Sequence, residues 1–190
     1  MKTKIILLML LLSTSALQMA ANCCNSSLVS ESRTSKPYHF INITGEMNVK
    51  IIQEKTPGVL VEGSNFQLDN TVTMLRNDTL FVFEANKRKN EGKVSMSINV
   101  ENMTMLEVSG KSIVYCEGMI NSDLISIKAL NGARIKLDLH ALNVKSNVSG
   151  CGFIDLSGMV GSISKQTDGC GSIDSNSLFI VDDTINSSNS

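Results

Sequence analysis

The sequence is poor in aromatic residues and in proline. Its 190 residues include no tryptophan, two tyrosines, six phenylalanines and two prolines. The sequence therefore contains few aromatic rings that could line a ligand cleft. Isoleucine, leucine, valine and methionine carry the apolar content, which favours stacked layers of aliphatic side chains.

Clustered positive charge is also absent. Lysine and arginine together number 17 against 18 acidic residues, and the formal net charge is −1. The one local basic cluster, Lys87-Arg88-Lys89, is short and flanked by asparagine, as is typical of a solvated loop tip. Because neutralising nucleic-acid phosphates requires clustered lysine and arginine, the sequence predicts no nucleic-acid partner.

Motifs for metal binding and covalent catalysis are missing too. His39 and His140 are the only histidines, and they lack the paired spacing of a zinc site. No Gly-x-Ser-x-Gly element accompanies the many serines. We therefore predict no metal site, no cofactor and no enzymatic activity.

One marked hydrophobic run lies near the start of the chain. Ile5 to Leu12 follow Lys2 and Lys4 and precede small residues at Ala20 and Ala21, the arrangement of a secretory signal. The run is too short to span a bilayer, which takes about 20 residues. We expect a signal peptide at residues 1–21, whose removal leaves 15 basic against 18 acidic residues and a net charge of −3.

The expected mature chain has serine- and asparagine-rich ends. Residues 22–37 and 182–190 have little to bury and are predicted to be disordered tethers around one domain at residues 38–181. Cys23 lies close to the expected cleavage point and is a candidate lipid attachment site, although the residues before it differ from a typical lipoprotein signal. We expect contact with a membrane only through such an anchor.

Between these ends, almost every segment alternates apolar and polar residues with period two, the pattern of half-buried strands. Asn77-Asp78 lies between two such segments and predicts a hairpin turn. No window shows a convincing amphipathic helix with caps. The domain is therefore predicted to be all-β. The clearest segments are Phe40–Ile43, Met47–Ile52, Val59–Glu62, Val72–Leu75, Thr79–Phe83 and Val94–Val100.

The second half of the domain repeats. Four short units begin with glycine or cysteine and reach isoleucine three residues later, at positions 113, 135, 154 and 173, which gives steps of 22, 19 and 19 residues. A unit of about twenty residues cannot bury its apolar face alone, but stacked units form a continuous core. The repeat predicts a single-domain, parallel β-helix-like solenoid with about 19 to 22 residues per rung, and a β-sandwich is the alternative. The residues expected to be buried are Ile113, Ile135, Ile154 and Ile173, with Tyr115, Leu137, Leu156 and Ser175 on the same face.

Three aspartates lie close to these isoleucines. Asp155 and Asp174 occupy the same place in adjacent units, and Asp138 lies nearby in the preceding one. Stacked carboxylates could form an edge that holds a cation or faces a ligand. A solvated acidic edge that deters strand pairing is the plainer alternative.

Stacking would also make Cys151 and Cys170 neighbours, because they begin the last two units. A rung spacing of about 4.8 Å falls within the range of Cα separations that disulfides use. We predict adjacency and a candidate disulfide, with two small buried thiols as the alternative. Cys116 belongs to a different column and should pair with neither.

Several segments in a characteristic order carry a family resemblance. They are Phe40–Val49, Val59–Gly63, Asn77–Val82, Val94–Val100, Leu106–Gly110, the Ser-Gly-x-Gly-x-Ile unit at Ser149–Ile154 and the looser unit at Asp168–Ile173. Together they resemble the GIN domain, described as the head domain of autotransporter adhesins in Gram-negative bacteria. The resemblance implies an exported β-helix-like domain in the periplasm or on the outer cell surface, with a function that is not proven.

The leading functional hypothesis is a non-enzymatic, adhesin-like module that binds a glycan or a protein, because a regular solenoid presents flat, extended polar faces. Two alternatives are a structural envelope protein without a specific ligand and a polysaccharide-degrading enzyme.

Overall fold

The computed structural model describes residues 28–34, 36–86 and 92–181. The expected signal peptide, Cys23 and the expected C-terminal tail lie outside the described residues. Among the described residues, no helix is long and apolar enough to cross a membrane.

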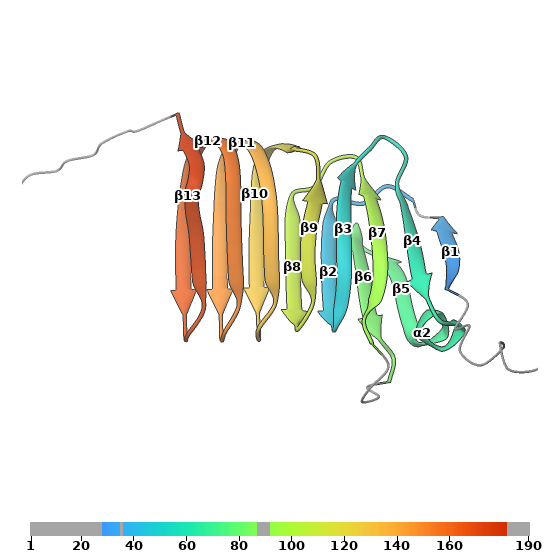
Figure 1. The fold of residues 1–190 in the computed structure, drawn as a ribbon. Helices are drawn as coiled ribbons and strands as arrows, with labels where there is room; N and C mark the ends of the chain where they lie inside the picture. The colour runs from blue at the N-terminus through green and yellow to red at the C-terminus, as the bar shows by residue number, and fades with distance from the viewer. Residues whose placement is uncertain (1–27, 35, 87–91, 182–190) are drawn as a thin grey trace, which may run out of the picture.

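The fold is all-β, with thirteen described strands joined in one curled, mixed sheet (Figure 1). The strands lie side by side along one axis, from β1 at one end to β12 and β13 at the other (Figure 1). Their bounds are β1 (Val29–Thr34), β2 (Phe40–Gly45), β3 (Met47–Gln53), β4 (Gly58–Gly63), β5 (Thr71–Arg76), β6 (Thr79–Glu84), β7 (Val94–Val100), β8 (Met105–Gly110), β9 (Ile113–Glu117), β10 (Ile120–Leu130), β11 (Arg134–Ser149), β12 (Phe153–Asp168) and β13 (Ser172–Ile180).

The sheet curls back on itself through its long strands. The first part of β11 pairs with β9, whereas its last part, residues 143–149, pairs with the end of β10. The strands joined through the first part of β11 form what we call the front layer. It comprises β1, β4, β7, β3, β9, the start of β10, the first parts of β11 and β12, and β13. The back layer comprises β5, β6, β2, β8 and the last parts of β10, β11 and β12. Apolar side chains between the two layers form one continuous core.

The pairing in the second half is parallel, with a step of 19 residues. Ile135 lies beside Ile154, which lies beside Ile173, and Leu137 lies beside Leu156. Four of these five side chains are fully buried, and Ile173 is partly buried because it belongs to the last strand. The first half adds antiparallel pairs between β1 and β4, β4 and β7, and β5 and β6. The structure thus shows a mixed sheet rather than the uniform parallel β-helix, and it shows no sandwich of two separate sheets.

The prediction that Ile113 is buried was wrong. Val114 pairs with Ile135 and is buried, whereas Ile113 faces outward beside Arg134. The reason is Ser112, which points inward, accepts a hydrogen bond from the Met47 amide at 3.2 Å and donates one to the Gly45 carbonyl at 2.9 Å. Because side chains alternate along a strand, an inward residue 112 turns residue 113 outward. Tyr115 is exposed for the same reason, although we had placed it on the buried face.

Two further elements differ from the sequence predictions. Val29–Thr34, within the predicted disordered tether, forms strand β1, which pairs with β4 along its whole length through backbone groups that need no apolar pattern. Residues Asn65–Asn70 form the short helix α2, which we had not expected. Its signal was a capping box in which Ser64 and Gln67 satisfy each other's backbone amides.

The predicted hairpin at Asn77-Asp78 is confirmed. It joins the antiparallel strands β5 and β6, and its two residues have φ angles of 47° and 62°. Positive φ at both central positions is the geometry of a type I′ turn, which matches the twist of the paired strands.

The last strands end the core with polar side chains. The inward column that contains Ile127 continues through Ser146 to Lys165, and Lys165 donates a hydrogen bond to the Ser175 hydroxyl of β13. An inward-pointing charge on an edge strand disfavours pairing with another chain. The C-terminal end of the stack is thereby closed by a lysine and a serine that belong to opposite layers.

We predict that Ile154→Asp unfolds the domain, because it places an unpaired carboxylate in a fully buried position and costs several kcal/mol of a typical stability of about 5 to 15 kcal/mol. The control is Phe153→Asp, which changes the adjacent outward-facing residue. Circular dichroism during thermal unfolding measures both. Two variants with equal melting temperatures would contradict the assignment of the inward face.

Candidate functional site

The predicted acidic edge is brought together only in part. Asp155 and Asp174 are direct partners across β12 and β13, but Asp138 pairs with Ser157 and lies in a different column. Lys136 occupies the place beside Asp155, and its Nζ lies 3.1 Å from the Asp155 carboxylate. The described part of the chain contains no group of three or more metal-ligating side chains. The edge is therefore a mixed row of charges rather than an acidic ladder.

The two cysteines that begin the last units are adjacent. Cys151 and Cys170 are joined by a disulfide with a Cα–Cα distance of 4.8 Å and a sequence separation of 19 residues. Cys116 lies in a different column, on the inward side next to Leu137, and is not bonded to another cysteine of the described chain. Burial raises the pKa of the Cys116 thiol, which keeps it protonated and unreactive at neutral pH.

A row of large side chains faces outward from the front layer. The register places Arg134 between Ile113 and Phe153 in one column, and Lys136 between Tyr115 and Asp155 in the next. We call these six residues the front array. Ile113, Tyr115 and Phe153 expose 39%, 44% and 38% of their surface, although side chains of this size are usually buried.

A second group of exposed apolar side chains lies further along the same layer, beyond the polar column of Asp138 and Ser157. His140, Met159 and Phe179 form one outward column across β11, β12 and β13. Met159 and Phe179 are both exposed. The exposed apolar side chains of the front layer thus form two groups that a polar column separates.

The charges of the front layer are largely paired. Lys136 contacts Asp155, and the Lys50 ammonium lies 2.6 Å from the Glu117 carboxylate. The hydrogen bond that the Lys50 ammonium donates to the Glu117 carboxylate raises the pKa of Lys50, so this lysine stays charged. The Arg134 side chain forms no hydrogen bond or ion pair with any other described residue, and it is exposed between Ile113 and Phe153. The front array therefore offers rings, an aliphatic side chain and planar hydrogen-bond donors on one rigid surface.

The back layer presents a different surface. Its outward side chains bond to one another across strands: Glu107 accepts hydrogen bonds from Asn42 and Lys128, and Asn147 donates one to Gln166. These ladders satisfy the polar groups within the sheet. The polar side chains of the back layer are thus bonded to one another, while Met74 and Leu124 also expose apolar surface on this layer.

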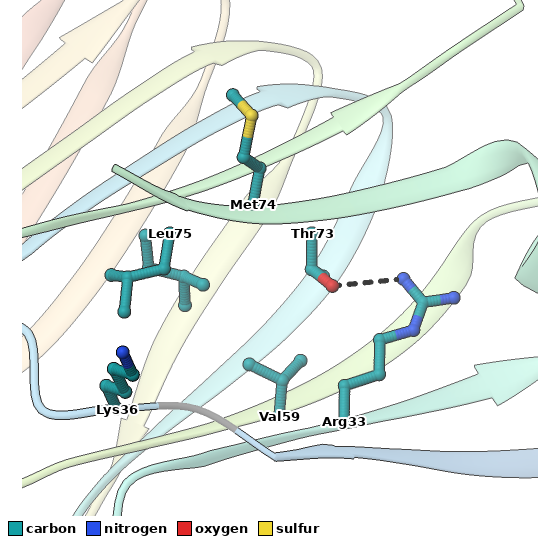
Figure 2. A pocket seen from close by; sticks show the side chains of 7 residues that line it. Arg33, Lys36, Val59, Thr73, Met74 and Leu75 are labelled. Atoms are coloured by element: carbon teal, nitrogen blue, oxygen red, sulfur yellow. Dashed lines mark hydrogen bonds between the residues drawn. The ribbon is translucent and has the colours of Figure 1, made fainter.

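A small pocket of about 290 Å³ lies at the opposite end of the stack, between strands β1 and β4 on one side and β5 and β6 on the other. Val59 and Leu80 contribute its apolar walls. In Figure 2, Thr73 and Leu75 point from β5 into this space, whereas Met74 points away from it.

Arg33 spans this pocket and ties the two free edges of the curled sheet together. Its Nη1 donates to the Thr71 carbonyl at 2.6 Å and to the Thr73 hydroxyl at 3.3 Å (Figure 2), and its Nη2 donates to the Leu68 carbonyl at 3.0 Å. The same guanidinium holds the pKa of Glu31 below its usual value. Arg33 thus links the two edge strands β1 and β5. Because its N–H groups already donate to groups of the protein, it does not offer an anion site.

Residues 37–190 match the model of a family described as "Putative auto-transporter adhesin, head GIN domain". The chain belongs to this family. The resemblance stated from the sequence is therefore confirmed. A search of curated proteins found no significant match to this GIN-domain chain.

Solved structures share the fold of this GIN domain at low sequence identity. A "putative adhesin" from Bacteroides fragilis has a TM-score of 0.75 and 17% identity, covering 80% of this chain and 72% of that one. A "putative adhesin" from Parabacteroides distasonis has a TM-score of 0.64 and 13% identity, covering 81% and 75%. A "putative lipid binding protein" from Parabacteroides distasonis has a TM-score of 0.56 and 14% identity, covering 79% and 97%. These likenesses establish the fold.

Sequence reasoning missed the front array. Its only signal was a set of large apolar residues at alternate positions, and alternation alone does not tell which set faces the core. The sequence pattern assigns Ile113 and Tyr115 to the core and gives Phe153 no role.

We predict that the Cys151–Cys170 disulfide stabilises the last two rungs. In the chain-entropy model a closed loop of this length contributes about 3 kcal/mol. Cys170→Ser, or reduction of the wild-type protein, should lower the melting temperature by several degrees. The double variant Cys151→Ser/Cys170→Ser should not respond to reductant. A wild-type melting temperature that reductant leaves unchanged, with no bridged peptide in a non-reducing digest, would contradict the disulfide.

We predict that Arg33→Met destabilises the domain, because it leaves the Leu68 and Thr71 carbonyls without their charged donor. Hydrogen bonds to charged groups contribute about 1.5 to 3 kcal/mol each, and partial exposure reduces that value here. Urea unfolding gives the free energy of unfolding. Arg76→Met, an exposed arginine on β5, is the control and should unfold like the wild type. Equal midpoints for the two variants would refute the closing role of Arg33.

Proposed function

We propose that this protein is an exported, non-enzymatic adhesin-like module of the Gram-negative cell envelope that binds a surface glycan through its front array. The observation that carries the proposal is the exposure of Ile113, Tyr115 and Phe153 around Arg134 and Lys136 on one rigid layer. Aromatic rings present an apolar face to the C–H groups of a sugar ring, and arginine and lysine donate hydrogen bonds to its oxygens.

The fold supports this role. The strands from β8 to β13 pair in parallel, and their backbone ladders hold neighbouring side chains of one outward column about 4.8 Å apart. A site built on strands needs little ordering when a ligand binds, which reduces the entropic cost of association. The family description and the names of two similar structures agree with an adhesin-like role at the cell surface.

The chemistry of the site favours binding over catalysis. Asp155 forms an ion pair with Lys136, and Asp174 accepts a hydrogen bond from the Asn176 amide. Both carboxylates are therefore already engaged by groups of the protein itself. One similar structure is named as a lipid-binding protein. Lipid binding is less well supported for this chain, because the charged Arg33 side chain crosses the pocket between β1 and β5.

The experiment is a glycan array probed with the wild-type protein and with Tyr115→Ala and Phe153→Ala. We expect reproducible binding to a set of glycans and a loss of about tenfold or more in each variant, because removing an aromatic anchor costs more than about 1.4 kcal/mol. Leu124→Ala, an exposed apolar residue outside the front array, is the control and should bind like the wild type.

Three results would argue against the proposal. The absence of binding to every glycan on the array would favour a structural envelope protein. Binding that persists in both aromatic variants would place the binding site outside the front array. Shortening of an acidic polysaccharide that disappears in Asp155→Asn or Asp174→Asn would favour the enzyme.

A further inference from the structure

A second hollow lies outside the front array, at the turns where the chain passes between the layers. Its volume is about 880 Å³, within the range of small-molecule sites. It is lined by segments that are far apart in sequence: the β2–β3 turn, helix α2, the end of β6, the start of β7, the β8–β9 turn and Asn131. We call it the corner cleft.

Glycines form the floor of the corner cleft. A Cβ atom on Gly110, whose φ angle is +90°, would lie 2.4 Å from the Gly45 carbonyl oxygen. A Cβ atom on Gly45 would lie 2.8 Å from the Glu84 carboxylate. The Gly45 backbone thus excludes a side chain at Gly110, and the Glu84 side chain occupies the space that a side chain at Gly45 would need.

The walls carry two acidic and two basic side chains. Glu84 accepts a hydrogen bond from the Glu46 amide at 3.3 Å, and the Lys93 ammonium donates one to the Lys111 carbonyl at 3.0 Å. The Lys111 ammonium lies 3.7 Å from the Glu46 carboxylate. The formal charges of these four side chains cancel, so the described part of the lining favours neither an anion nor a cation.

Amide and aromatic groups complete the lining. Asn131 donates to the Ser109 hydroxyl at 3.2 Å, which orients its amide group, and Phe66 contributes an aromatic ring. The site therefore offers fixed donors, fixed acceptors and one apolar patch. Hydroxyl groups match such a mixed lining because each one both donates and accepts.

We propose that the corner cleft binds a neutral oligosaccharide of a few sugar units. A sugar ring combines hydroxyl groups with an apolar C–H face, so it uses every feature of this lining. The site is separate from the front array and does not depend on the function proposed for it.

The test is a titration of the full-length chain, as the cell processes it and labelled with ¹⁵N, followed by heteronuclear NMR. The probes are maltotriose, mannotriose and chitotriose as neutral sugars, with trialanine as a zwitterionic peptide and inorganic phosphate as an anion. We expect at least one trisaccharide to shift the amide signals of Gly45, Gly110 and Lys111 in a saturable way.

The variants Glu84→Gln and Lys93→Met should each weaken that binding about tenfold. Glu107→Gln and Lys128→Met, which alter a charge pair on the back layer, should leave it unchanged. Phe153→Ala should also leave it unchanged, which separates this site from the front array.

The proposal is overturned if no trisaccharide shifts these amides in a saturable way, or if the sugars shift only signals of the front array. It is also overturned if trialanine or phosphate binds there more tightly than every sugar.

Discussion

The parallel ladder between β11 and β12 is the interaction on which the rest of this structure depends. It runs in unbroken register from Arg134 beside Phe153 to Ser149 beside Asp168 and therefore crosses both layers of the sheet. This one register stacks Ile135 on Ile154 in the core and Lys136 on Asp155 at the surface. Because partners in this register are 19 residues apart, the turns that follow β11 and β12 lie next to each other. This places Cys151 and Cys170 within disulfide reach. Core, surface and covalent link are consequences of the same backbone pairing.

The same constraint explains how the protein acquires an unusual surface. A strand gives alternate side chains to the core and to solvent, so a single inward residue fixes the parity of all those that follow. Ser112 does this for β9, because its hydroxyl is held by backbone groups of the β2–β3 turn. Ile113 and Tyr115 are thereby turned outward, next to Arg134 and Lys136. Burying a serine hydroxyl without a hydrogen-bond partner would lower the stability of the fold, and these two hydrogen bonds offset that penalty.

The sequence was sufficient for the strands and for the parallel pairing of the last rungs, because period-two alternation and a constant 19-residue step are local signals. It was not sufficient for Ile113. The Gly-Lys-Ser-Ile segment resembles the later units in sequence, but the strand pairing is shifted by one residue, so that Val114 and not Ile113 lies beside Ile135. The sequence also failed to predict β1, because residues Val29–Thr34 carry no apolar pattern. This strand pairs with β4 through backbone groups, and its Arg33 contacts β5. The front array and the corner cleft join residues from several strands, so no window of sequence contains them.

A layered sheet whose front face carries the front array, and whose back face carries polar side chains bonded to one another, is consistent with a molecule that displays a binding surface. The most direct test is hydroxyl-radical footprinting of the protein with and without a glycan that binds it on an array. The account predicts strong protection of Tyr115, Phe153 and Met159, with little change at Leu124 and Met74 on the back layer. Unchanged oxidation of the front-layer residues while the glycan is bound would contradict it.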